Sequence, residues 1–242
     1  MHHKKLPLMI IALLLTLFPL FCAAETLAQE KQISSYEIQK LKIKENEPPY
    51  EINCTIPVFK EAQGFDPKEL NARIKQLVTE RVTESKNGFA SREYREKQSS
   101  YMEMNFTVYP ASTRLVSIVF QIESYGAGAA HPIHWSECLT YDKEKNRFLS
   151  LRTILNNGDD FVPIISRLCI EQLKTQEGLS DIHWIEEGAG PKAKNFEHFY
   201  LDTSGIGIIF DEYKVGPYVA GAHGVMIPYS KIKSLLDPSL GL

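Results

Sequence analysis

The chain lacks a cluster of basic residues. Its 242 residues carry 27 Lys and Arg against 30 Asp and Glu, a formal net charge of −3, and the basic residues are scattered along the sequence. Proteins that hold nucleic acid through its phosphates gather positive charge on one face. The composition therefore argues against nucleic acid as a partner.

Cysteine is scarce, with four residues in the chain. Cys22 lies in an N-terminal apolar run, which leaves Cys54, Cys138 and Cys169 for the folded protein. An odd number allows at most one disulfide and one remaining thiol. Cys138 and Cys169 are the nearer pair and are predicted to share a domain, so we predict a bond between them. The alternative is three buried thiols without a bond.

The usual catalytic and cofactor motifs are also missing. The small-residue segments at Gly126 and Gly188 do not extend to a dinucleotide or P-loop motif, which argues against a nucleotide site. The sequence contains no zinc-protease motif, nucleophile elbow or paired-carboxylate arrangement. His134 and Cys138 share a predicted strand, where four residues span roughly 13 Å, too far for a catalytic dyad. No cofactor is expected.

The one long hydrophobic run is N-terminal. MHHKK is basic, residues 6–21 are apolar, and Ala23 and Ala24 are small, which is the order of a signal peptide. We predict cleavage before Glu25, with cleavage after Ala28 as a second choice. Removing residues 1–24 takes away Lys4, Lys5 and no acid, so the formal net charge goes from −3 to −5.

These features predict an exported protein, periplasmic or secreted. About 16 apolar residues are short for a membrane-spanning helix, which needs about 20. We therefore expect no stable membrane span in the mature form. Two alternatives are an uncleaved N-terminal anchor and a lipid anchor on Cys22, although Leu20 and Phe21 are bulkier than lipid-modification sites prefer.

The pattern of apolar residues predicts an α+β fold. Alternation or continuous apolar runs predict strands at 35–44, 50–59, 101–109, 115–125, 134–141, 196–201, 206–210 and 224–228. A helix should follow Asp66-Pro67, with its apolar stripe at Leu70, Ile74, Leu77, Val78 and Val82. A second should be capped by Asp159 or Asp160, with its stripe at Phe161, Ile164, Ile165, Leu168, Cys169 and Leu173.

Because helices and strands are segregated rather than alternating, we expect both main helices to pack on a largely antiparallel sheet. A short helix at 230–236 should close the chain. We predict a signal peptide at 1–24, a small strand-strand-helix unit at 25–98 and a larger α+β domain at 99–242.

Two loops resemble each other: GAGAAHPIHW at 126–135 and GPYVAGAHG at 216–224. Tyr125, Trp135, Tyr213 and Tyr218 surround these small residues, and tyrosine and tryptophan supply much of the energy of binding surfaces. The loops also carry His131, His134 and His223, which leaves a metal site as an alternative to a binding surface.

Four parts of the chain carry a resemblance to a known family. Three are SIVFQIESYGAGAAH (117–131), CLTYDKEKNRFLSLRTIL (138–155) and NFEHFYLDTSGIGIIFDEYKVGPYVAGAHGVMIPYSKIKSLL (195–236), and the fourth is the predicted strand, helix and strand that precede them. They resemble the extracytoplasmic domain shared by RsiV-type anti-sigma factors, which bind lysozyme, and by the N-terminal region of PdaC-type peptidoglycan deacetylases. The resemblance implies an α+β fold and a lysozyme-type enzyme or peptidoglycan as partner.

The sequence differs from that family in three places. Only MHHKK precedes the apolar run, where RsiV-type proteins carry a sigma-binding segment, and the PdaC-type catalytic domain has no counterpart before Leu242. Residues 128–131 read Gly-Ala-Ala-His where members of the family usually have Gly-Gly-Ala-His. We therefore expect a stand-alone recognition domain.

The predicted function is that of a non-catalytic envelope protein, a sensor or inhibitor that binds a lysozyme-type muramidase or peptidoglycan. The predicted partner-binding residues are Tyr125, His131, Trp135, Tyr213, Tyr218 and His223. The alternative is a small metal-dependent or cysteine–histidine hydrolase that uses His131 and His223. The sequence leaves the oligomeric state open.

Overall fold

The computed structural model describes residues 36–46, 49–90, 99–156 and 161–242. The predicted signal peptide and the Asp159 or Asp160 cap lie outside these residues. Strands β1 to β6 form one sheet in sequence order. They are β1 (Tyr36–Asn46), β2 (Pro49–Phe59), β3 (Ser100–Pro110), β4 (Leu115–Tyr125), β5 (Ile133–Asp142) and β6 (Arg147–Phe148). Neighbours are antiparallel except β2 and β3, which run parallel because a helix connects them.

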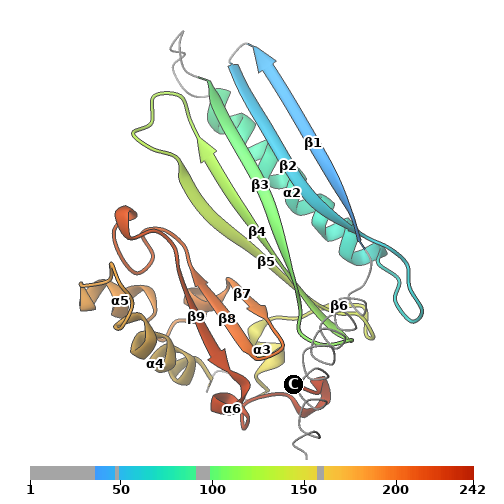
Figure 1. The fold of residues 1–242 in the computed structure, drawn as a ribbon, viewed down its shortest axis with the longest axis vertical. Helices are drawn as coiled ribbons and strands as arrows, with labels where there is room; N and C mark the ends of the chain where they lie inside the picture. The colour runs from blue at the N-terminus through green and yellow to red at the C-terminus, as the bar shows by residue number, and fades with distance from the viewer. Residues whose placement is uncertain (1–35, 47–48, 91–98, 157–160) are drawn as a thin grey trace, which may run out of the picture. The chain divides into compact units, whose positions relative to one another are not determined.

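That helix, α2 (Lys68–Ala90), begins where the sequence predicts. The Asp66 carboxylate accepts a hydrogen bond from the Lys68 amide at 3.0 Å, and Pro67 occupies a position that needs no donor. The predicted stripe from Leu70 to Val82 is buried, and Phe89 extends it. Figure 1 shows α2 lying against one face of the sheet, where these side chains form a core with β2, β3 and β4.

A second, three-stranded antiparallel sheet forms from the C-terminal part: β7 (Phe199–Leu201), β8 (Gly205–Phe210) and β9 (His223–Pro228). The α+β class is confirmed, with the strands divided between two sheets. Four helices and three 3₁₀ turns accompany the second sheet: α3 (Leu151–Ile154), α4 (Phe161–Leu173), α5 (Ile182–Gly188), α6 (Tyr229–Ile232), η1 (Ala193–Phe196), η2 (Tyr218–Ala220) and η3 (Pro238–Leu240). None of the helices in the described ranges is long and apolar enough to cross a membrane.

The buried face of α4 differs from the predicted stripe. Ile165, Cys169 and Leu173 are fully buried, whereas Ile164 and Leu168 are only partly covered. The helix packs on β9 and also on α5, a short helix that the sequence pattern did not predict. The Ser166 hydroxyl donates to the carbonyl of Ala189, directly after α5, at 2.7 Å. Contact with α5 thus turns the buried face toward Val162 and Ser166.

The two sheets pack against each other through a few close contacts. The Tyr109 and Tyr200 rings stack with centroids 4.1 Å apart, and the Leu201 amide donates to the buried Ser117 hydroxyl at 2.9 Å. Gly207 makes room for this packing, since a Cβ there would collide with the Tyr200 ring. The sequence-based division near residue 98 stays a prediction; β2 and β3 pair on either side of it in one sheet.

The expected disulfide between Cys138 and Cys169 is not formed. Cys54, Cys138 and Cys169 are all free thiols. Cys138 lies on β5, whereas Cys169 belongs to the α4 face that packs on the second sheet. Because β7 to β9 stand between β5 and α4, as Figure 1 shows, the two side chains occupy different layers. Proximity in sequence was a poor guide because the second sheet inserts between them.

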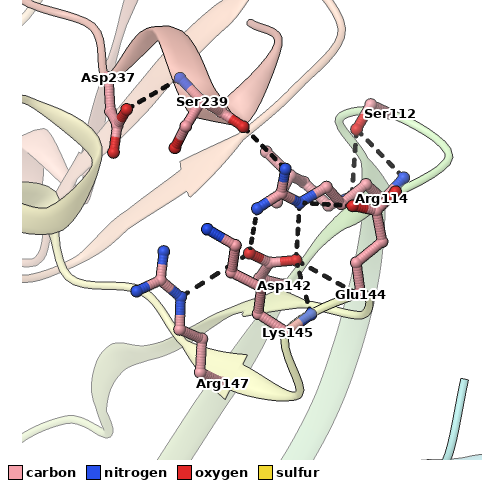
Figure 2. Close-up of polar contacts among 9 residues, drawn as sticks. Ser112, Arg114, Asp142, Glu144, Lys145, Arg147, Asp237 and Ser239 are labelled. Atoms are coloured by element: carbon pink, nitrogen blue, oxygen red, sulfur yellow. Dashed lines mark hydrogen bonds and ion pairs between the residues drawn. The ribbon is translucent and has the colours of Figure 1, made fainter.

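A buried carboxylate ties the first sheet to the C-terminal turn. Asp142, at the end of β5, is fully buried and accepts two hydrogen bonds from Arg114, at 2.8 and 2.6 Å. The backbone amides of Glu144 and Lys145 donate to the same carboxylate. Arg114 also donates to the Ser239 carbonyl at 2.8 Å (Figure 2). This network holds η3 against the start of β4 and the end of β5.

Candidate functional site

The structure brings the two small-residue loops together. The His131 ring, from the loop between β4 and β5, stacks on Tyr218 of η2 with centroids 3.7 Å apart and planes 25° apart. The Tyr213 ring lies 5.8 Å from that of Tyr218, and its hydroxyl lies 3.3 Å from Nε2 of His131. We call His131, Tyr213 and Tyr218 the aromatic cluster.

A histidine between two carboxylates holds the aromatic cluster in place. Both the backbone amide and Nδ1 of His134 bond the Glu212 carboxylate, at 3.1 and 2.7 Å. Nε2 of His134 lies 3.4 Å from Glu123, which also accepts the Tyr101 hydroxyl. The Glu212 side chain is only 10% exposed, so water competes little for these bonds. The segment after β8, which carries Tyr213, is thereby fixed to β5.

Tyr213 has an unusual backbone conformation. Its φ is +63°, in the left-handed region that residues other than glycine rarely adopt. The residue is nevertheless 51% exposed, and its carbonyl accepts a hydrogen bond from the Trp184 indole of α5 at 3.0 Å. A strained backbone conformation persists only where the surrounding contacts hold it in place. Residues in such conformations are frequent at functional sites.

The other predicted site residues lie outside the aromatic cluster. Tyr125 stacks on Tyr101 at 5.7 Å, at the end of the paired strands β3 and β4. Trp135 packs against the α2 core and lines a groove of about 410 Å³ together with Arg81 and Phe89. His223 bonds Gln176 at 2.8 Å. The structure therefore gives His131 and His223 different partners.

A smaller cleft of about 230 Å³ lies on the other face of the first sheet, beside the aromatic cluster. Its floor comes from β3, β4 and β5, and Asp211 and Ala222 form its wall. The polar side chains that line it are Glu103, Asn105, Gln121, Glu123, His134, Ser136 and Asp211. We call this space the polar cleft.

Asp211 and Glu212 are adjacent acids, and each is bonded by a histidine. Nδ1 of His198 lies 2.8 Å from Asp211, next to the place where Glu212 bonds His134. The hydrogen bond that His198 donates to Asp211 raises the pKa of His198, against the opposing effect of burial. Sequence reasoning missed both pairs, although the acidic doublet directly after β8 was a visible signal.

The thiols are not activated. Burial raises the pKa of Cys54 to about 11 and that of Cys169 to about 12. Burial, with a contribution from Asp211, also raises the pKa of Cys138. Catalytic cysteines need the opposite shift. Within the described ranges, no group of three His, Cys, Asp or Glu side chains is placed to hold a metal ion.

Two family models match this chain in succession. The model described as deacetylase PdaC matches residues 43–134, and the model described as protein of unknown function DUF3298 matches residues 152–230. The two matched stretches follow one another along the chain, and each covers less than half of it. His131 and His134 lie in the first stretch, and Glu212, Tyr213 and Tyr218 lie in the second. The aromatic cluster is therefore built by both.

Two named relatives are similar to this chain in sequence. The peptidoglycan-N-acetylmuramic acid deacetylase PdaC of Bacillus subtilis is 27% identical over 136 residues, which are 56% of this chain and 29% of that protein. The chain therefore spans less than a third of the length of this relative. The immunogenic protein MPT64 of Mycobacterium tuberculosis is 25% identical over 206 residues, which cover 82% of this chain and 83% of that one.

Solved structures support the fold. A DUF3298-family protein from Bacteroides fragilis superimposes with a TM-score of 0.59 at 21% identity, over 86% of this chain and 97% of that one. A DUF3298-family protein from Pseudomonas aeruginosa superimposes with a TM-score of 0.59 at 17% identity, over 86% of this chain and 98% of that one. The resemblance to RsiV-type anti-sigma factors stays a prediction.

Proposed function

We propose that this protein is an exported, non-catalytic binding protein of the cell envelope, and that its partner is a lysozyme-type muramidase or peptidoglycan. The observation that carries the proposal is the aromatic cluster. It joins two loops distant in sequence into one partly exposed surface, and Tyr213 keeps an unfavourable φ within it. Aromatic side chains fixed in this way bind without losing much conformational freedom.

One relative supports the same ligand class. The stretch that matches the PdaC model includes His131 and His134, and the Bacillus subtilis relative is named for its action on peptidoglycan. The mature charge of −5 expected after cleavage at Glu25 would favour encounter with a basic muramidase. Export and the role of the protein as a sensor or inhibitor are parts of this proposal.

The hydrolase alternative receives less support. His131 stacks on Tyr218, whereas His223 bonds Gln176, so the two histidines proposed for that activity serve different contacts. The raised pKa of Cys138 disfavours the thiolate that a cysteine–histidine hydrolase requires.

The proposal is tested by binding of the mature protein to purified sacculi and, separately, to lysozyme. We expect Tyr218→Ala to weaken binding to the true partner by about 1–2 kcal/mol, as hot-spot aromatic residues do. Tyr213→Gly should weaken it as well, although glycine relieves the unfavourable φ and should leave the fold at least as stable. Circular dichroism would verify the fold of both variants.

Val219→Ala is a matched control, because Val219 is 91% exposed beside Tyr218 and carries no aromatic ring. Binding to neither sacculi nor lysozyme at micromolar concentration would refute the proposal. Equal binding by wild type and Tyr218→Ala would move the interface elsewhere.

A further inference from the structure

One polar atom of the residues that line the polar cleft is buried without a partner within the described ranges. It is Oδ1 of the Asp211 carboxylate. Ser136, another lining residue, is only 8% exposed. Leaving a buried polar atom unpaired costs free energy. A ligand that supplies hydrogen-bond donors would remove that cost.

The floor of the polar cleft carries an unfavourable charge arrangement. Glu103 and Glu123 occupy directly paired positions on the antiparallel strands β3 and β4, and both line the cleft. Like charges directly opposite each other destabilise a sheet. Glu123 is bonded by Tyr101 and lies near His134, whereas the described residues give Glu103 no hydrogen bond or ion pair. The cleft therefore suits a ligand with a positive charge.

Amide groups complete the lining. Asn105 and Gln121 are paired across the same two strands, two residues along each strand from Glu103 and Glu123. The Gln121 side-chain amide donates a hydrogen bond to the Thr107 hydroxyl at 3.2 Å. The volume of about 230 Å³ is below the roughly 300–1,000 Å³ of sites for drug-sized ligands, so one ring fits. Several hydroxyl-binding groups around one ring-sized space match a sugar better than a single lysine or arginine side chain.

We propose that the polar cleft binds one hexosamine ring of a glycan that carries a free amine. The ammonium group lies between Glu103 and Asp211, and the ring hydroxyls bond Ser136, Asn105 and Gln121. The adjacent aromatic cluster provides a flat surface on which the next ring of the chain can lie. This inference rests on the proposed function and specifies its ligand, a de-N-acetylated stretch of wall glycan.

The test uses the mature protein and two soluble probes, a β-1,4-linked glucosamine tetramer and its fully N-acetylated counterpart. Calorimetric titration should show tighter binding of the free-amine tetramer, with an affinity that falls as salt screens the charges. Glu103→Gln should weaken its binding at least about fivefold. Ala222→Leu, which fills the cleft from an exposed position, should do the same.

Glu177→Gln is the matched control, since it removes one negative charge at an exposed position that is not part of the cleft lining. Glu177→Gln should bind the free-amine tetramer as tightly as wild type does. That result would show that the tetramer binds in the cleft and is not merely attracted to an acidic protein. Thermal unfolding should show Glu103→Gln to be no less stable than wild type, because the like-charge pair is removed.

Three outcomes would overturn the inference. They are no binding of the free-amine tetramer, equal or tighter binding of the acetylated tetramer, and unchanged binding by the cleft variants. If Glu103→Gln weakens binding to lysozyme but not to the tetramer, the cleft receives a basic side chain of a protein instead. Retention on sacculi together with failure of the tetramer would refute this inference and leave the proposed function standing.

Discussion

At the scale of single residues, histidine–carboxylate pairs organise the site. His134 bonds Glu212 and His198 bonds Asp211, so two consecutive acids are each fixed by a histidine from a different segment. His134 comes from β5, and His198 directly precedes β7. Neither pair is visible from sequence spacing, because the partners lie 78 and 13 residues apart. The aromatic cluster depends on both, since Tyr213 follows the two acids directly.

The His198–Asp211 pair predicts a pH dependence of stability. The pKa of His198 is raised above its ordinary value of 6.5, mainly by the hydrogen bond to Asp211. The folded state therefore binds a proton more tightly than the unfolded state. The stabilisation is fully present below pH 6.5 and is lost as the pH rises through the raised pKa.

Urea unfolding of wild type and His198→Asn at a series of pH values would measure this effect. The difference in unfolding free energy should be larger at pH 5.5 than at pH 8.5. A difference that stays constant with pH would show that the charge of His198 does not contribute. Glu61→Gln, an exposed change that is not among the groups acting on His198, serves as the control.

At the scale of elements, α4 shows how packing selects one helix face from several apolar candidates. Its sequence, FVPIISRLCIEQL, is apolar around most of its circumference, so periodicity alone did not locate the buried stripe. Contact with β9 and α5 placed Ile165 and Cys169 inside and left Leu168 partly covered. By contrast, α2 carries charged residues on its outer face, and its stripe was predicted correctly.

Truncation of α4 should reflect this orientation. Ile165→Ala should cost about 2–5 kcal/mol of unfolding free energy, as fully buried aliphatic truncations do. Leu168→Ala should cost clearly less, because its side chain is only partly buried. Chemical denaturation of both variants would compare them. A larger loss for Leu168→Ala would mean that the helix is rotated from the orientation seen here.

At the scale of the whole molecule, the Arg114–Asp142 pair holds the C-terminal turn on the first sheet. Burial by itself would raise the pKa of Asp142, but the bonds from Arg114 and two backbone amides outweigh it and lower the pKa. The pair thus stabilises the fold above pH 3.8, the ordinary pKa of an aspartate side chain. This stabilisation is lost as the pH falls through the lowered pKa of Asp142.

Arg114→Gln should therefore be strongly destabilising at pH 7. It leaves Asp142 buried without its main partner, a change that costs about 3–5 kcal/mol, and the lower end applies because Arg114 reaches the surface. The loss should diminish as the pH falls below 3.8, where the carboxylate becomes protonated. Arg167→Gln, which disrupts an exposed pair on α4, should change stability little. Equal losses for the two variants would contradict this role.

Elements whose pattern is local can be predicted from the amino-acid sequence. Alternating residues in β1 to β5 and the cap and stripe of α2 are readable because each depends on neighbours within a few positions. The two loops with small and aromatic residues were visible for the same reason. Which of these residues come into contact depends on the folded chain.

Stacking of His131 on Tyr218, the separate placement of His223 and the unbonded thiols all follow from how the second sheet docks on the first. That docking depends on long-range contacts such as Tyr109 with Tyr200 and Arg114 with Ser239. Contacts between residues about a hundred positions apart leave no periodicity in a single sequence, so their outcome required the folded chain.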